Sequence, residues 1–397
     1  MSGIELRLCR LELFHQVATS QSAHASRPVV LVRVLCADGP EGWGECAALA
    51  EPTYTAEYAT GAAELLAHFL VPELLQSPVL DDEDPAREAM ARLARVRGHP
   101  MAKAAIEMAV LDAHLQARGQ SLAAHLGATR PSVPAGATVS VGVPGEVVAA
   151  AQLVEAAGYR RLKCKVAPGR DVDSVRAVAE AFPHLVLSVD ANGAYDLGDK
   201  EHRRRLEMLD GLGLMAIEQP LGPDELAGHA ELARLLETPV LLDESVEDPG
   251  DLEAAIGLHA LDGLSVKPGR LGGIGAACAA TKVAVAAGLH VAIGGMFETG
   301  LARAAHLAVA ALEGFDLPGD LGASDRYFVP DLTAPHELVD GELVVPDSPG
   351  LGRRPDPERL AATTQALAFG TSGPGAGEAL TWTPAHSSTR GLPRLEL

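Results

Sequence analysis

Acidic residues close three successive apolar segments in the middle of the chain, and their side chains are the first candidates for chemistry. LVLSVD ends at Asp190, LMAIEQ carries Glu218 next to its end, and PVLLDE carries Asp243 next to its end. Taken singly, each acid is better explained as a solvated strand end or as a salt bridge at the mouth of a barrel. Converging carboxylates would repel one another without a cation, and ligands drawn only from Asp and Glu oxygens suit hard ions better than zinc. The three acids together therefore predict an Mg²⁺ or Mn²⁺ site.

Lysines stand on either side of these acids in chain order. Lys163 and Lys165 end the segment RRLKCK, and Lys267 lies near the end of GLSVKP. Alternate residues of a strand share one face, so Lys163 and Lys165 are expected to point the same way. A lysine acts as a base only when neutral, so we expect neighbouring cations, Arg270 among them, to lower the lysine pKa. Lysines on opposite sides of one carbon would suit abstraction of the proton next to a carboxylate, with the metal ion stabilising the enolate.

From about residue 133, short β-rich segments alternate with helical stretches rich in Ala and Leu. The segments end at intervals of 23 to 28 residues, near Gly142, Lys165, Asp190, Glu218, Asp243, Lys267 and Gly294. One strand and one helix need about this length, so seven or eight such units predict an α/β fold, a (β/α)8 barrel of the TIM type, over residues 131–324. The C-terminal strand ends of such barrels form the active-site face. An open doubly wound sheet is the alternative, disfavoured because no Gly-x-Gly-x-x-Gly opens the first unit.

Residues 1–130 have a different pattern and predict a separate α+β domain. LVRVLCADGPEGWGEC indicates a hairpin that turns at residues 38–40, and KAAIEMAVLDAHLQARGQSLAAHLG has helical spacing. Strand and turn character returns at 325–355, which we expect to complete the N-terminal domain. The remaining residues, 356–397, are rich in Ala, Gly, Thr, Ser and Pro, and we expect a loosely packed tail.

Composition and charge narrow the classes of partner. The 397 residues carry a formal net charge of −21, which argues against nucleic acid or an anionic membrane surface as the main partner. The sequence contains no apolar stretch of about 18 residues, the length that would predict a membrane span. The five cysteines lack zinc-site spacing, and the N-terminus lacks the pattern of a signal peptide. We therefore expect reduced thiols and a cytoplasmic location.

The order of the motifs resembles the muconate-lactonising branch of the enolase superfamily. The motifs are KCKV, VDANGAY, IEQPL, LDES and VKPGRLGG, preceded by EGWGEC, EPTYTAEY and MAKAAIEMAVLDAHL. GGMFETGLARA and LPGDLGASDRYF most resemble the o-succinylbenzoate synthase / N-acylamino acid racemase family. The resemblance covers about residues 4–352 and implies a modified (β/α) barrel with an α+β capping domain.

The resemblance also implies roles for single residues. Lys165 would be the base and Lys267 the opposing lysine, with Lys163, Asn192 and Arg270 in support. The three acids would bind Mg²⁺ or Mn²⁺. In the synthase reaction Lys165 takes the proton while Lys267 stabilises the enolate by its charge, whereas in the racemase reaction the two lysines exchange roles. Arg270 matches family members that have racemase activity.

Candidate substrate-binding residues lie in two cap loops and after the seventh strand. They are Thr19, Tyr54, Gly294, Gly295, Met296 and Glu298. The early loop FHQVATSQSAHASR lacks the Pro-Phe-Arg-type segment that is common in the family, which leaves the identity of the substrate open. Glu244 directly follows Asp243, and strand alternation predicts that its side chain faces away. His306, where Asn is common in the family, is expected to be structural.

We therefore expect a lyase, an isomerase or both. The reactions are those of o-succinylbenzoate synthase, which dehydrates a cyclohexadiene carboxylate in menaquinone synthesis, and of N-acylamino acid (N-succinylamino acid) racemase. One alternative is another muconate-lactonising-type enzyme, a cycloisomerase or an epimerase, although the Asp-x-Asp of an epimerase is missing at Gly294. The other is a catalytically silent metal-binding barrel, against which the retained lysines argue. The expected partners are a small-molecule carboxylate and further copies of the chain in a homo-oligomer.

Overall fold

An antiparallel sheet forms one side of the molecule in the computed structural model, which describes residues 1–18, 23–76, 83–373 and 375–385. Its strands lie in the order β15-β14-β1-β2-β3. They are β1 (Gly3–Ala18), β2 (Ala23–Leu35), β3 (Glu41–Cys46), β14 (Thr364–Thr371) and β15 (Thr383–Pro384). Strands β2 and β3 pair on either side of residues 38–40, which confirms the predicted hairpin.

Helices pack on this sheet, directly or through one another, and bury its apolar face. They are α1 (Ala59–Leu65), the π-helix η1 (Leu66–Leu70), α2 (Val71–Leu75), α3 (Pro85–Leu93), α4 (Pro100–Arg118) and α5 (Leu122–Leu126). Two glycines of the EGWGEC motif explain how closely β3 approaches α4. A Cβ atom on Gly42 or Gly44 would overlap the backbone carbonyl oxygens of Ala109 and Ala105, respectively. Both positions therefore need glycine for the helix to lie on the strand.

The expectation of a loosely packed tail beyond residue 356 is wrong for the part that the structure describes. Helix α14 (Pro357–Thr363) leads into β14, which pairs with β1 from Gly3 to Cys9 and so covers its other edge. The alternation in TQALAFGT is enough for a strand beside β1, whose edge would otherwise expose a row of unpaired backbone groups. Composition alone hid this strand, because small and polar residues are compatible with it. Residues 386–397 lie outside the described chain.

The second sheet is parallel and carries the strands predicted from the repeating pattern. Its order, β11-β10-β9-β8-β7-β6-β5, follows the sequence without a crossover. The strands are β5 (Gly136–Val139), β6 (Arg161–Lys165), β7 (Val186–Asp190), β8 (Ile217–Glu218), β9 (Val240–Leu242), β10 (Gly263–Val266) and β11 (His290–Ile293). Sequential order with every neighbour parallel excludes the doubly wound alternative, in which the order reverses at a switch point.

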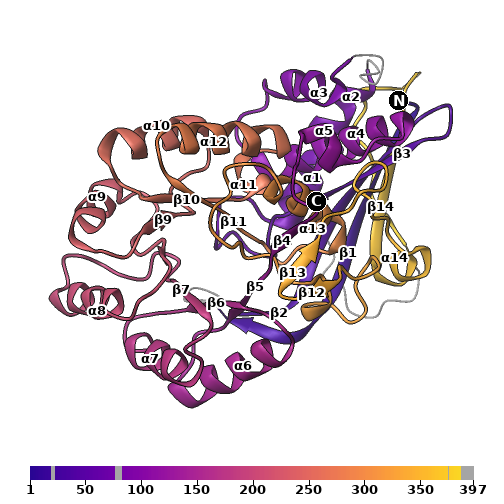
Figure 1. The fold of residues 1–397 in the computed structure, drawn as a ribbon. Helices are drawn as coiled ribbons and strands as arrows, with labels where there is room; N and C mark the ends of the chain where they lie inside the picture. The colour runs from indigo at the N-terminus through magenta and orange to yellow at the C-terminus, as the bar shows by residue number, and fades with distance from the viewer. Residues whose placement is uncertain (19–22, 77–82, 374, 386–397) are drawn as a thin grey trace.

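The helices that follow these strands cover the outside of the curled sheet (Figure 1). They are α6 (Pro144–Ala156), α7 (Val172–Ala181), α8 (Lys200–Asp210), α9 (Leu226–Leu235), α10 (Pro249–Leu258), α11 (Pro268–Leu271), α12 (Ile274–Ala286) and α13 (Gly300–Ala310). Several begin at an aspartate N-cap, such as Asp171 before α7 and Asp248 before α10, which satisfies their first backbone amides. None of the helices in the described part of the chain is long and apolar enough to cross a membrane.

An irregular segment takes the place of an eighth strand and closes the barrel. The amide of Leu317 donates to the carbonyl of Val291 in β11 at 3.2 Å, and the amide of Asp320 donates to that of Ile293 at 2.8 Å. On the other side, the amide of Gly136 at the start of β5 donates to Leu321 O at 3.1 Å. Residues 317–321 therefore lie in the seam between the first and last strands and bond to both.

The remaining strands join the two parts of the fold. Strands β12 (Leu338–Val339) and β13 (Glu342–Val344) form a small sheet with β4 (Ser132–Pro134), just before the barrel begins. Buried carboxylates of the antiparallel domain also form hydrogen bonds to the barrel. Glu107 of α4 accepts from the amide of Gly275 at 3.0 Å, and Glu45 of β3 accepts from the amide of Thr299 at 3.0 Å. These bonds satisfy the first turns of α12 and α13.

Candidate active site

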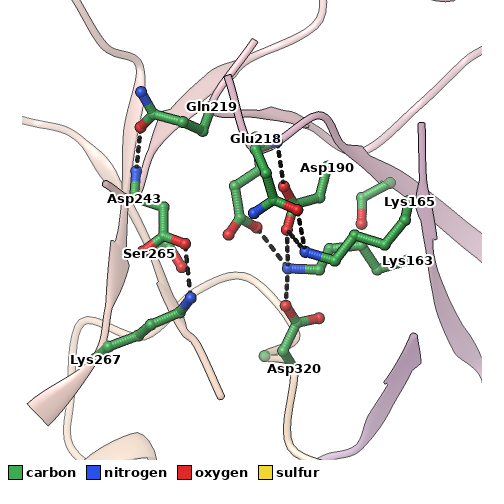
Figure 2. Close-up of polar contacts among 12 residues, drawn as sticks. Lys163, Lys165, Asp190, Glu218, Gln219, Asp243, Ser265, Lys267 and Asp320 are labelled. Carbon is green, nitrogen blue, oxygen red and sulfur yellow. Dashed lines mark hydrogen bonds and ion pairs between the residues drawn. The ribbon is translucent and has the colours of Figure 1, made fainter. Parts of the chain in front are cut away.

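Five consecutive strands of the barrel bring a charged side chain to the same rim. Lys165, Asp190 and Glu218 are the last residues of β6, β7 and β8, while Asp243 and Lys267 directly follow β9 and β10. Figure 2 shows Lys163 and Lys165 on one side of this cluster and Lys267 on the other, with the carboxylates of Asp190, Glu218 and Asp243 between them. The structure thus brings together the residues that the sequence predicted.

The two lysines of β6 share a face, as alternation predicted, and both contact Asp190. Lys165 Nζ lies 2.7 Å from Asp190 Oδ2 and 2.7 Å from Asn192 Oδ1. Lys163 Nζ lies 2.9 Å from Asp190 Oδ2 and 3.0 Å from Glu218 Oε2. Asn192, two residues beyond β7, adopts a left-handed backbone with φ of 45°, which turns its side chain toward Lys165.

The opposite side of the site is built around Asp243. Its Oδ2 accepts from Lys267 Nζ at 2.6 Å, and its Oδ1 is contacted by the buried guanidinium of Arg270. Arg270 is in turn held by the carbonyl oxygens of Val246 and Ser265, each at 2.7 Å. The basic residue three positions after Lys267 therefore acts on the same carboxylate as Lys267.

Lys267 does not show the lowered pKa that was expected of a lysine acting as a base, and the pKa of Lys163, which was expected to act as a neighbouring cation, is raised as well. Burial alone would lower both pKa values, but the carboxylates outweigh burial and raise them: Asp190 and its neighbours around Lys163, and Asp243 beside Lys267. The acids respond in the opposite sense, and Lys163 and Lys165 overcome burial to hold the pKa of Asp190 well below its usual value. The surrounding carboxylates therefore favour the protonated, positively charged forms of Lys163 and Lys267.

The carboxylates fit a hard divalent ion in their chemistry, although their present partners are cations of the protein. In the described chain, no three Asp, Glu, His or Cys side chains are grouped so that they could hold a metal ion. Lys163 lies between Asp190 and Glu218, and Lys267 engages Asp243. Yet the buried Oε1 atom of Glu218 has no hydrogen-bond partner among the described residues. Burial and the neighbouring acids raise the pKa of Glu218 to about 7, although Lys163 at its other oxygen lowers it, so the ionised carboxylate would gain from further positive charge.

Of the residues expected to bind substrate, some lie beside Lys267 and Asp243 and others do not. Tyr54, from the cap, reaches the site and donates from Oη to Asp243 Oδ1 at 2.7 Å. Gly294 follows β11, where a Cβ would lie 2.6 Å from Lys267 Cε, so glycine leaves room for the lysine chain. Met296 Sδ lies 3.7 Å from Lys267 Nζ. Thr19 lies outside the described residues.

Gly295 and Glu298 belong to the same loop but are turned toward its supports. A Cβ on Gly295 would lie 3.1 Å from the carbonyl oxygen of Asp320, in the barrel seam. Glu298 is fully buried, and its carboxylate is bonded by Arg303 Nη2 at 2.7 Å and by the amide of Met296 at 2.5 Å. His306 lies 3.3 Å from the same carboxylate inside α13, in keeping with a structural histidine. The structure thus gives Glu298 the position of a loop support.

Three polar residues of the site escaped prediction or were placed wrongly. Asp320 forms ion pairs with Lys163 and Arg161, and only its place in the quoted LPGDLGASD motif hinted at it. Gln219, with φ of 39°, accepts from the amides of Asp243 and Ser245 at 2.9 and 3.2 Å. Glu244 was expected to face away, but its Oε1 accepts from Asn192 Nδ2 at 2.8 Å. Strand alternation fails there because β9 already ends at residue 242.

Family models match both parts of the fold. The mandelate racemase / muconate lactonizing enzyme N-terminal domain matches residues 7–127, and the enolase C-terminal domain-like model matches residues 146–359. The chain belongs to the mandelate racemase / muconate lactonizing enzyme family. This finding confirms the resemblance seen in the motifs. Enzymes of the enolase superfamily, to which the family belongs, use a divalent metal ion.

Similar members of this family have names that describe enzymes. An N-succinylamino acid racemase from Amycolatopsis sp is 45% identical over 370 residues, which are 92% of this chain and 98% of the relative. An o-succinylbenzoate synthase from Geobacillus kaustophilus is 40% identical over 364 residues, 91% of this chain and 95% of the relative. A solved enolase-superfamily member from Listeria innocua Clip11262 superposes with a TM-score of 0.86 at 32% identity and covers 94% of this chain and 99% of its own. This family member is therefore an enzyme built as a capped barrel.

Proposed function

We propose that this enzyme removes the proton next to a carboxylate, as an o-succinylbenzoate synthase, an N-succinylamino acid racemase, or both. The observation that carries the proposal is the placement of Lys165 and Lys267 on opposite sides of the acidic cluster (Figure 2). A planar enolate formed between two such lysines is open to proton transfer on either face. The names of the two relatives described above support this function over a cycloisomerase or an epimerase.

In racemisation, each lysine has two duties. Lys165 removes the proton from one enantiomer, and Lys267 delivers a proton to the other face of the same carbon. For the opposite enantiomer, the two exchange duties. The Tyr54 ring, the Met296 sulfur and Asp243 around Lys267 Nζ hold the ammonium in one place. The Arg270–Asp243 ion pair supports this reaction. Arg270 shares the negative charge of Asp243, which weakens the ion pair between Asp243 and Lys267 and makes proton loss from Lys267 easier.

In the synthase reaction, the same geometry performs a dehydration in menaquinone synthesis. Lys165 takes the proton next to the carboxylate of the cyclohexadiene substrate and returns it to the departing hydroxyl, so that the C–O bond breaks and water leaves. Lys267 keeps its proton and offers its positive charge to the enolate. The high pKa of Lys267 agrees with this role without further change at the site.

The proposed cofactor is Mg²⁺ or Mn²⁺, held by Asp190, Glu218 and Asp243. Bound there, the ion would supply positive charge to the carboxylate oxygens of the substrate as negative charge develops. The unpartnered Glu218 oxygen and the all-oxygen donor set support this assignment. Asp243 has to loosen its contact with Lys267 to take part, which would free the lysine for proton transfer.

The decisive experiment compares kcat/KM side by side on an N-succinylamino acid and on the cyclohexadiene carboxylate, with Mg²⁺ or Mn²⁺ present. We expect turnover of at least one substrate and hydrogen exchange at its α-carbon. Neither turnover nor exchange in a folded, metal-loaded preparation would refute the proposal. A homo-oligomer remains part of the proposal, and its test is the mass in solution measured by light scattering.

A further inference from the structure

Asp320 lies inside the barrel and is fixed there from several sides. Its amide is bonded to β11, which makes it part of the seam that closes the barrel. Its carboxylate contacts the guanidinium of Arg161 and the ammonium of Lys163, two residues of β6 that point inward with Lys165. Arg161 is itself held by Gly319 O at 2.8 Å and by Ser188 Oγ at 3.0 Å. The position of the Asp320 carboxylate is therefore set by backbone and side-chain contacts that do not involve the proposed metal ligands.

Lys163 has three carboxylate partners of two different kinds. Asp190 and Glu218 are proposed metal ligands, and they lie 2.9 and 3.0 Å from Lys163 Nζ. Asp320 is the third partner and belongs to the seam. If Asp190 and Glu218 give their oxygens to a divalent ion, the ammonium of Lys163 must withdraw from both. A buried ammonium without a counter-ion is strongly unfavourable, so a partner has to remain for it.

We infer that Asp320 is a positioning residue, which keeps Lys163 as its own ion-pair partner and so leaves Asp190 and Glu218 available to a divalent metal ion. The inference rests on the proposed function in one respect, namely that these two acids bind the ion. The segment that closes the barrel therefore has a second role. It carries Asp320, the counter-ion that decides how strongly Lys163 competes with a metal ion for Asp190 and Glu218.

The test is the affinity of the purified full chain for Mn²⁺, measured by titration calorimetry and by the signal of free Mn²⁺ in electron paramagnetic resonance. Asp320→Asn keeps the size of the side chain and its contact with Arg161 but removes the charge that holds Lys163. Lys163 should then stay on Asp190 and Glu218, and the Kd for Mn²⁺ should rise about tenfold or more, as for other residues that support metal ligands. The matched control is Asp171→Asn, another buried aspartate that pairs with an arginine, at 2.7 Å from Arg205. It should leave the Kd unchanged.

A double-mutant cycle separates this role from a simple effect of negative charge. Lys163→Gln removes the competing ammonium, so it should bind Mn²⁺ at least as tightly as the unchanged protein. Adding Asp320→Asn to it should change the Kd by less than about twofold, the usual error of such cycles. If Asp320→Asn is poorly folded, the Arg161→Gln/Asp320→Asn pair replaces it, because no arginine is then left without its carboxylate.

Two results would overturn the inference. One is an unchanged Kd in Asp320→Asn, and the other is an equal loss of affinity with and without Lys163, which would mean that Asp320 acts through its own charge. Glu218→Gln distinguishes this failure from failure of the proposed function. If Glu218→Gln weakens Mn²⁺ binding while Asp320→Asn does not, only the role of Asp320 is wrong. If neither variant changes the Kd, the metal site itself has been misplaced.

Discussion

Lys267 lies over the ring of Tyr54, with its Nζ atom 4.6 Å from the ring centroid. Tyr54 comes from the N-terminal cap and Lys267 from the end of a barrel strand, so the proposed catalytic lysine is held between the two domains. The hydroxyl of Tyr54 also bonds to Asp243, the carboxylate that anchors Lys267. The cap therefore contributes directly to the position and charge of a proposed catalytic group.

Replacing Tyr54 should separate the contribution of its hydroxyl from that of its ring. Tyr54→Phe loses the hydrogen bond to Asp243, and kcat/KM should fall roughly tenfold, the cost of one hydrogen bond to a charged group. Tyr54→Ala also loses the ring under Lys267, so its kcat/KM should fall further, by about the worth of a cation–π contact. Kinetics on both substrates would show whether their ratio changes. Equal losses on the two substrates, or simple unfolding, would count against a role in specificity.

Exchange of the lysines should distinguish the two chemistries. Lys165→Ala should stop both reactions, since no base remains on that face. Lys267→Arg keeps the charge but not a proton that can be given up, so racemisation should fall by a larger factor than dehydration, if the bulkier group fits. In D₂O, Lys267→Ala should still exchange the α-hydrogen of one enantiomer. NMR of the substrate measures this exchange directly.

Retained racemisation in Lys165→Ala would contradict the whole assignment of the site. Equal losses for Lys267→Arg on the two substrates would contradict only the separate roles of the lysine. Metal content is measured in each variant, because Lys165 and Lys267 both contact proposed ligands.

Removal of metal should abolish activity, and Mg²⁺ or Mn²⁺ should restore it. Glu218→Gln should raise the concentration of metal needed for half-maximal activity, since one anionic ligand is lost. Activity measured after chelation, with the metal content checked by atomic emission, tests this prediction. Full activity in a preparation shown to be free of metal would rule out the proposed cofactor.

Gly294→Ala should disturb Lys267 without changing any charged residue. The added Cβ would lie 2.6 Å from Lys267 Cε and 2.8 Å from Ser265 Oγ, closer than packed atoms tolerate. We expect kcat to fall by about tenfold or more, as when a catalytic group is displaced by an ångström. Gly257→Ala in α10 is the control, because a Cβ there meets no atom within 4 Å. Equal activities of the two variants would show that Lys267 does not need this space.

Glu45 should make the stability of the protein depend on pH. Burial raises its pKa from the usual 4.5 to about 7, despite hydrogen bonds from Thr299. A carboxyl that holds its proton more tightly in the folded state stabilises the protein at low pH, and this contribution is lost as pH rises through 7. Relative to Glu45→Gln, which cannot titrate, the free energy of unfolding should fall between pH 5 and 8. The slope should reach at most about 1.4 kcal/mol per pH unit.

Urea unfolding at several pH values measures this difference. The exposed Glu12 supplies the control, since Glu12→Gln removes one charge without any burial. The unchanged protein and Glu12→Gln should show the same pH profile. Parallel profiles for the unchanged protein and Glu45→Gln would show that Glu45 is already ionised at pH 5.

The sequence alone determined the barrel and the membership of the charged rim. Apolar segments of strand length at regular intervals leave few arrangements other than a parallel barrel. In such a barrel the C-terminal strand ends meet on one face. It follows that Lys165, Asp190, Glu218, Asp243 and Lys267 had to come together, whatever their exact contacts. The alternation of strand residues likewise placed Lys163 beside Lys165.

Only the tertiary structure decided which of these groups pair, and what else reaches them. Asp320 enters the cluster because an irregular segment fills the seam, and no periodic pattern marks such a segment. The strand β14 escaped prediction because pairing with β1, more than 350 residues away in the chain, provides most of its stability. The charge on the lysines also depends on three-dimensional packing, since the cations and carboxylates around each one come from different strands. Spacing along the chain can place residues on one rim, but the balance of burial and opposite charge there is set by distances that only the folded chain defines.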